Sequence, residues 1–150
     1  MAIDLDCTYD EKFRFDRLYG GNEMRAPADG ASRVYEMTIS FESRDDVRVV
    51  FVRSEIDLAN APIVRRYLAD AARDTTALVV SLEGCPFIDS SGLALLLEAG
   101  AAFGRRFALV AQVGSFPRRV VELAALAGRL RLCPSLDAAL ASCKRGMVAA

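Results

Sequence analysis

The sequence contains no histidine, and this absence excludes a large class of chemistry. Without an imidazole there can be no Ser-His-Asp triad, no Cys-His pair and no histidine ligand for a metal ion. The nucleophile-elbow motif GxSxG, the Walker A phosphate loop and the EF-hand calcium loop are also missing. We therefore expect the chain not to be an enzyme and to hold no metal ion and no cofactor.

An excess of charge and a long apolar run are missing as well. Lys and Arg number 19 and Asp and Glu number 20, so the formal net charge is -1. Such a balance gives no sign of binding to nucleic acid or to an anionic membrane. No stretch approaches the roughly 20 apolar residues of a membrane span. Acidic residues throughout residues 1–16 leave no hydrophobic core for a signal peptide, so we expect a soluble cytoplasmic protein.

Cysteine is scarce, and its spacing carries no metal or redox motif. The chain has four cysteines, none of them in a CxxC pair: Cys7, Cys85, Cys133 and Cys143. This spacing argues against zinc binding and thioredoxin-like chemistry. The last three have apolar neighbours, and we expect buried, reduced thiols.

The residues that are present indicate one globular domain behind an extension. Residues 1–19 mix acidic, basic and aromatic side chains without a period, and residues 20–32 are rich in Gly, Ala, Pro and polar residues. We predict a partly disordered extension at 1–32, a folded domain at 33–146 and a short tail at 147–150. The aromatic residues of the extension could dock on the domain or on a partner: Tyr9, Phe13, Phe15 and Tyr19.

Hydrophobic periodicity predicts an α/β fold. Residues 35–42 alternate apolar and polar side chains, and residues 47–53 are more apolar, which favours an antiparallel hairpin. Apolar strands at 76–82, 107–113 and 130–133 then alternate with helices after Asn60 and at 93–103, 115–127 and 136–144. This order predicts a mixed, mostly parallel sheet with about four helices. Asn60, Ser115 and Ser135 are the predicted N-caps, and Gly128 is a predicted helix stop.

The stretch FIDSSGL, residues 87–93, lies between a predicted buried strand and a helix and has two interpretations. In the structural one, Asp89 or Ser90 caps the helix and Gly92 permits tight packing. In the functional one, a serine lies where open α/β folds present their sites. A phosphate there would be held by backbone N–H groups and would add about −1.5 to −2 charges. The chain geometry alone favours the cap.

The whole pattern, however, resembles the STAS domain, whose best-known soluble members are bacterial anti-sigma factor antagonists. The resemblance rests on the hairpin, then SEID at 54–57, then LVVSLEGCPFIDSSGLALL at 78–96. AALAGRLRLCPSLDAAL, residues 124–140, resembles the later helix, short strand and last helix of that family. The resemblance covers roughly residues 35–143, and residues 1–32 have no counterpart in it.

The resemblance implies a phosphorylation switch at Ser90, the serine directly after Asp89. In such antagonists this serine is phosphorylated by a partner kinase that is also the anti-sigma factor. The unphosphorylated protein binds the partner, so that a sigma factor is released, and the phosphorylated protein does not bind. Asp57 matches the acidic end of the family's Gly-Glu-Leu-Asp loop. Ser54 replaces its glycine, which would strain the loop if that position needed a positive φ.

The residues expected to contact the partner surround Ser90. They include Leu95, which we place on a small, polar face of the helix after Ser90 and expect to be exposed. The full set of expected contacts is Glu55, Asp57, Asp89, Ser91, Gly92 and Leu95.

Two other functions remain open at this point. One is a STAS scaffold or small-ligand sensor whose serine is never phosphorylated. The other is an enzyme that uses the carboxylates of Glu55, Asp57 and Asp89 beside Ser90, although nothing pairs a nucleophile with a base.

Overall fold

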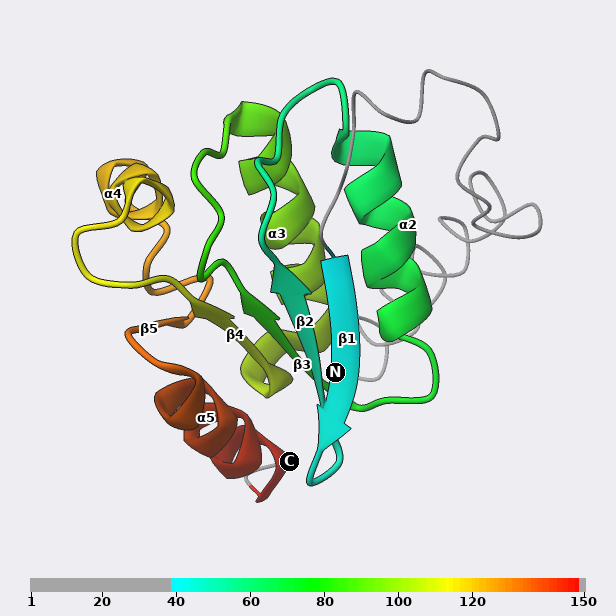
Figure 1. Cartoon of the computed structure of the whole chain (residues 1–150). Helices are drawn as coiled ribbons and strands as arrows, with labels where there is room; N and C mark the ends of the chain where they lie inside the picture. Colours follow the sequence, from blue (N-terminus) through cyan, green and yellow to red (C-terminus); the bar gives the residue numbers. More distant parts are fainter. Residues whose placement is uncertain (1–38, 149–150) are drawn as a thin grey trace.

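The structure is a computed structural model that describes residues 39–148 (Figure 1). Its elements, in chain order, are β1 (Ile39–Arg44), β2 (Val47–Val52), α2 (Ala61–Ala71), β3 (Ala77–Ser81), α3 (Ser90–Phe103), the 3-10 helix η2 (Gly104–Arg106), β4 (Phe107–Val110), α4 (Phe116–Leu123), β5 (Leu132–Cys133) and α5 (Leu136–Val148). The predicted extension at 1–32, the predicted strand start at residue 35 and Cys7 lie outside the described residues.

A 5-stranded sheet in the order β1-β2-β3-β4-β5 organises the described part of the chain. β1 pairs antiparallel with β2, and the remaining neighbours are parallel. Asp45 and Asp46 adopt positive φ angles of 49° and 67° between β1 and β2. Two such residues in succession are typical of a type I′ turn, whose twist suits a tight hairpin. The α/β fold with an antiparallel hairpin and a mostly parallel sheet is therefore confirmed.

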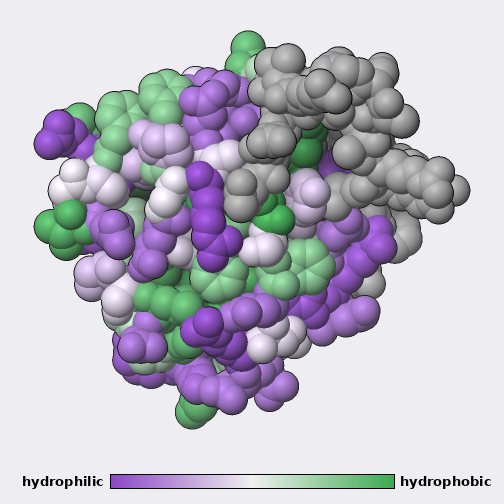
Figure 2. Space-filling model, in the orientation of Figure 1, coloured by the Kyte–Doolittle hydropathy of each residue, from purple (hydrophilic) through white to green (hydrophobic). Residues whose placement is uncertain are grey.

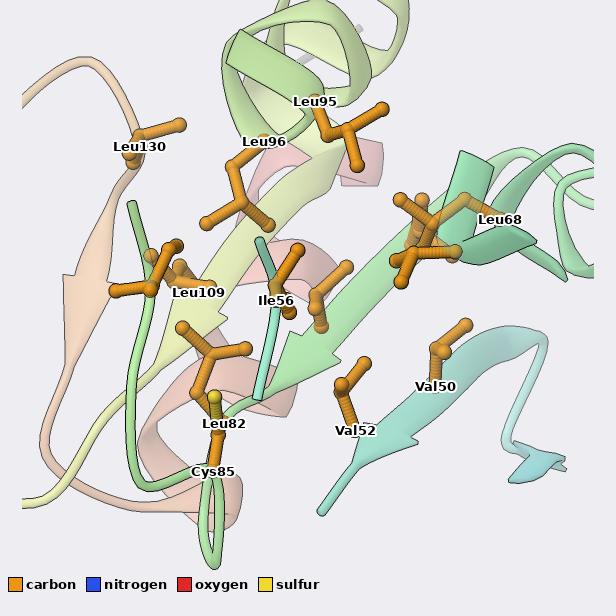
Figure 3. Close-up of a cluster of buried hydrophobic side chains, with 14 of the residues drawn as sticks. Val50, Val52, Ile56, Leu68, Leu82, Cys85, Leu95, Leu96, Leu109 and Leu130 are labelled. Atoms are coloured by element: carbon orange, nitrogen blue, oxygen red, sulfur yellow. The ribbon is translucent and has the colours of Figure 1, made fainter. Parts of the chain in front are cut away.

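Helices cover both faces of the sheet and bury an apolar core on each side (Figure 1). On one face, side chains of β2, β3 and β4 pack with those of α2, α3 and α4 in one cluster. Figure 3 shows members of this cluster, with Leu95 and Leu96 directed from α3 toward the sheet. On the other face, Ala139 and Cys143 of α5 pack against small and branched residues of β2, β3 and β4. Continuous apolar strands are what burial on both faces requires.

Three helix boundaries differ from the prediction: α5 continues through Gly146 to Val148 rather than ending at Lys144, and the other two have a local cause. α3 begins at Ser90 rather than at Leu93, because the Asp89 side chain caps it. α4 ends at Leu123 rather than at Ala127, and Ala125 then takes a left-handed φ of 58°. The helix therefore stops before Gly128. Within residues 39–148, no helix combines the length and the apolar character needed to cross a membrane.

Candidate functional site

Ser90 is the first residue of α3 and is exposed at what we call the carboxyl edge, the edge of the sheet at which β2, β3 and β4 end (Figure 1). The loop that follows β2 is joined to the segment before Ser90 by a parallel bridge between Ile56 and Ile88. In this bridge Ile56 N donates to Phe87 O at 2.9 Å and Asp89 N donates to Ile56 O at 3.1 Å. The loops after β2 and β3 therefore form one platform beside Ser90.

Asp89 connects this platform to the helix. Its Oδ1 accepts hydrogen bonds from Ser91 N at 2.8 Å and from Gly92 N at 3.2 Å, which makes it the N-cap of α3. Its Oδ2 accepts a hydrogen bond from Leu58 N at 3.0 Å, in the loop after β2. One carboxylate thus fixes the start of α3 and the position of the neighbouring loop together.

A phosphate on Ser90 would find few free backbone donors, which corrects the expectation that N–H groups would hold it. Of the four N–H groups that open a helix, those of Asp89, Ser91 and Gly92 already have acceptors. The Asp89 carboxylate takes the place that a bound anion occupies at an open helix N-terminus. A phosphoryl group on Ser90 would therefore lie beside a negative side chain.

Asp57 and Asn60 hold the loop after β2 by a reciprocal pair of hydrogen bonds. Asp57 N donates to Asn60 Oδ1 at 2.9 Å, and Asn60 N donates to Asp57 Oδ1 at 3.0 Å. The buried Asn60 also donates from Nδ2 to Glu55 O at 2.7 Å. Asn60 precedes α2 as predicted, but its side chain does not cap that helix. The geometry gives the Asp57 carboxylate a role in loop shape, and Glu55 remains exposed beside it.

Ser54 does not show the strain that a glycine replacement could have caused. It is not among the described residues with positive φ, so serine suits its backbone. Its Oγ is buried without a hydrogen-bond partner in the described part of the chain.

Gly92 is buried and lies where α3 meets the Ile56–Ile88 bridge. A Cβ at this position would be 2.5 Å from Ile88 Cγ1 and 3.1 Å from Ile56 Cγ2. A glycine is required for this close approach, as the structural interpretation of the sequence predicted. Because it is buried, Gly92 shapes the site from below, and its contact with a partner stays a prediction.

The expectation that Leu95 is exposed is wrong. Only 2% of Leu95 is exposed, and its side chain belongs to the core between α3, α2 and the sheet (Figure 3). α2 packs along α3, and Arg65 of α2 pairs with Glu98 of α3 at 2.7 Å. Since α3 has neighbours on two sides, more of its surface is buried than a single helical stripe predicts.

Sequence reasoning missed a set of apolar side chains that are exposed at the carboxyl edge. Phe87 and Phe116 stack with their ring centroids 5.3 Å apart, and they join the loop before Ser90 to the start of α4. Leu58 and Val113 are 76% and 77% exposed on the loops after β2 and β4. We call Leu58, Phe87, Val113 and Phe116 the edge patch. Figure 2 shows green atoms between purple ones along this upper edge of the molecule.

A signal for the edge patch was present in the sequence. Val113 is the last residue of the predicted strand at 107–113, and the other three follow predicted strands; all four lie next to Gly, Pro, Asp or Ser. Segments that follow such strands meet at one edge of a parallel sheet. Apolar residues in several of them therefore indicate a shared surface.

The carboxylates that an enzyme at this site would use have structural roles in this fold. The carboxylates of Asp57 and Asp89 accept backbone hydrogen bonds, and no group of three or more metal-ligating residues occurs within residues 39–148. Burial raises the pKa of the Cys85 thiol, and it raises the pKa of Cys143 to about 11. Both thiols are thus protonated at neutral pH and are poor nucleophiles.

Replacing Asp89 by alanine should lower the free energy of unfolding by about 1–3 kcal/mol, since it removes an N-cap and leaves Leu58 N without its acceptor. Asp89→Asn is the matched variant, because its carbonyl oxygen still caps α3 while its amide nitrogen cannot accept from Leu58 N. In urea unfolding, Asp89→Ala should lose more free energy of unfolding than Asp89→Asn. Amide exchange at Leu58 should accelerate in both variants; unchanged exchange would contradict the assigned bond.

Residues 38–139 match the family model described as STAS domain. The anti-sigma-F factor antagonist RsfB of Mycobacterium tuberculosis is 30% identical over 115 residues, which are 75% of this chain and 93% of RsfB. A crystal structure of an anti-sigma factor antagonist from Mycobacterium paratuberculosis matches with a TM-score of 0.67 and 32% identity, over 73% of this chain and 95% of that one. A Thermotoga maritima protein of 20% identity shares the fold, with a TM-score of 0.63, over 71% of this chain and 95% of that one.

Proposed function

Since the chain belongs to the STAS domain family, we propose that it is an anti-sigma factor antagonist that acts by partner switching at Ser90. The relatives described above are named as antagonists, which are regulatory proteins rather than enzymes. The partner is an anti-sigma factor with serine kinase activity, and a sigma factor is affected indirectly, in the cytoplasm. The observation that carries the proposal is the exposed position of Ser90 at the start of α3, next to the edge patch.

In the unphosphorylated state, the surface around Ser90 suits a protein partner. The hydroxyl of Ser90 is small and uncharged, and the exposed rings and aliphatic side chains of Phe87 and Leu58 lie on the same platform. Burial of such apolar area contributes about 25 cal/mol per Å². A partner that covers the platform therefore gains from apolar burial without having to desolvate a charge at Ser90.

In the phosphorylated state, the same surface is costly to cover. A phosphoserine carries about −1.5 to −2 charges at neutral pH. The Asp89 carboxylate lies next to it, and most N–H groups of the first turn are already used. A partner would have to remove water from this charge with little compensation from the domain. Release then needs no change of fold.

The other expected contact residues divide into two groups in this proposal. Glu55 is exposed, and Ser91 is half-buried next to Ser90, so both can touch a partner. Asp57 and Asp89 act mainly by holding the two loops in place.

The experiment is phosphorylation of the full chain by candidate anti-sigma factor kinases of the source organism with ATP. Intact mass should increase by one phosphoryl group, and peptide mapping should locate it on Ser90. Ser90→Ala should abolish the increase, and Ser91→Ala, the matched variant at the neighbouring position, should preserve it. Absence of phosphate on Ser90 with every such kinase would favour the unphosphorylated scaffold or ligand sensor instead.

A further inference from the structure

The edge patch exposes four apolar side chains at one edge of the sheet, and the charges around them indicate what kind of segment could cover them. Its residues come from three loops and the start of α4, and two of them expose about three quarters of their surface. Carboxylates border it at Glu55, Asp57 and Asp89. Two exposed cations lie close to these residues in the sequence: Arg53, which stands over the Phe51 ring, and Arg119 on α4. Arg118 is paired with Glu122 at 2.7 Å, so the three carboxylates outnumber the other cations. An apolar segment with positive charges suits such a surface.

The direction of β1 brings the start of the described chain to the same edge. Ile39, the first residue of β1, pairs with Val52, the last residue of β2. In Figure 1 the start of β1 lies level with the arrowhead of β2, at the upper edge of the sheet. The described chain therefore begins at the carboxyl edge, and the family match begins only at residue 38.

One stretch of those residues has the required composition. KFRFDRLY, residues 12–19, contains three aromatic residues and a leucine. Lys12, Arg14 and Arg17 against Asp16 give it three positive charges and one negative, a net charge of +2. These charges oppose the carboxylates that border the edge patch.

The distances allow an intramolecular contact. Neighbouring strands lie about 4.8 Å apart, so β4, three strands from β1, is about 15 Å from the attachment point. The 19 residues between Tyr19 and Ile39 could reach at most about 65 Å, at about 3.3–3.6 Å per residue, so the chain is long enough to cover this distance. Tethering of this kind gives an effective concentration in the millimolar range, so a contact that is weak between separate molecules becomes largely occupied.

We propose that residues 12–19 dock on the edge patch of the same molecule and compete with the partner for the surface beside Ser90. The competition rests on the proposed function, whereas the docking itself does not. Phosphorylation of Ser90 adds negative charge next to the docked Lys12, Arg14 and Arg17 and tightens the contact. In the phosphorylated chain, the edge patch is then covered by residues 12–19, and Ser90 carries the charge of the phosphate.

The test compares methyl NMR spectra of the full chain with those of the double variant Phe13→Ala, Phe15→Ala. Removal of two rings should shift the methyl resonances of Leu58 and Val113 in the edge patch. The methyl resonances of Val148, exposed on α5, should not move. Tyr9→Ala, which removes an aromatic ring outside residues 12–19, is the matched variant. It should leave the methyl resonances of Leu58, Val113 and Val148 unchanged. Unchanged Leu58 and Val113 resonances in the double variant would overturn the proposal.

Two further measurements separate the possible outcomes. The shift differences should persist on tenfold dilution; their loss would assign the contact to a second copy and overturn the intramolecular docking. The double variant should bind the anti-sigma factor about 3–10-fold more tightly, as expected if the segment covers the site in most molecules. Shifted resonances with equal affinity would overturn the competition. Shifted resonances without binding of either protein to any such kinase would leave the docking intact and refute the proposed function.

Discussion

Ser90→Glu is expected to weaken binding of the anti-sigma factor by about 100-fold or more. A charge placed in a covered contact next to Asp89 lies beside a second carboxylate and meets few free N–H groups. Unfavourable charge placement in an interface costs several kcal/mol, and every 1.4 kcal/mol is tenfold in affinity. Isothermal titration calorimetry with the purified kinase measures the effect directly.

Two controls give this result its meaning. Ser90→Ala should retain the affinity of the unmodified protein, since it removes a small hydroxyl and adds no charge. Ser43→Glu adds the same charge near the end of β1, at the end of the sheet opposite the carboxyl edge. In the unmodified protein, Arg48 Nε donates a hydrogen bond to this serine. This variant should leave the affinity within about twofold. Equal affinities of Ser90→Glu and the unmodified protein would refute the switch.

Leu95→Ala is expected to destabilise the domain by about 2–5 kcal/mol. The side chain is 2% exposed, and its truncation leaves a cavity between α3 and the sheet. Leu123→Ala is the matched variant, because Leu123 is 81% exposed and its loss should change stability by less than about 0.5 kcal/mol. Urea unfolding monitored by circular dichroism gives both values.

The same pair of variants decides between burial and partner contact. Folded Leu95→Ala protein should bind the anti-sigma factor with nearly unchanged affinity, because the residue does not reach the surface. A stability close to that of the unmodified protein, together with a large loss of affinity, would show that Leu95 is a contact residue after all.

The order of the elements could be predicted because two periods alternate clearly along the chain. Residues 77–80 and 107–111 are apolar without interruption, which is typical of short strands buried on both faces. Boundaries were less accurate where two caps compete. Asp89 and Ser90 can each cap α3, and only the link from Asp89 Oδ2 to Leu58 N decides between them. That link joins loops far apart in the sequence.

The orientation of α3 about its own axis could not be predicted from its composition. Leu93, Leu95, Leu96 and Leu97 surround the helix with apolar side chains, so no stripe stands out. The bridge between Ile56 and Ile88 and the close approach at Gly92 fix the orientation instead. The edge patch escaped prediction for a related reason, because its four residues share one edge only once the loops of three strands are aligned.

The antiparallel course of β1 also has a practical consequence for experiments on this molecule. A fluorescent protein or affinity tag fused shortly before Ile39 would be tethered beside Ser90, since Ile39 pairs with Val52 at the carboxyl edge. α5 instead runs toward η2, where Gly146 meets the carbonyl of Arg105 just before β4 begins. Reporters fused after Val148 therefore start at the far end of the domain and leave the phosphorylation surface unobstructed.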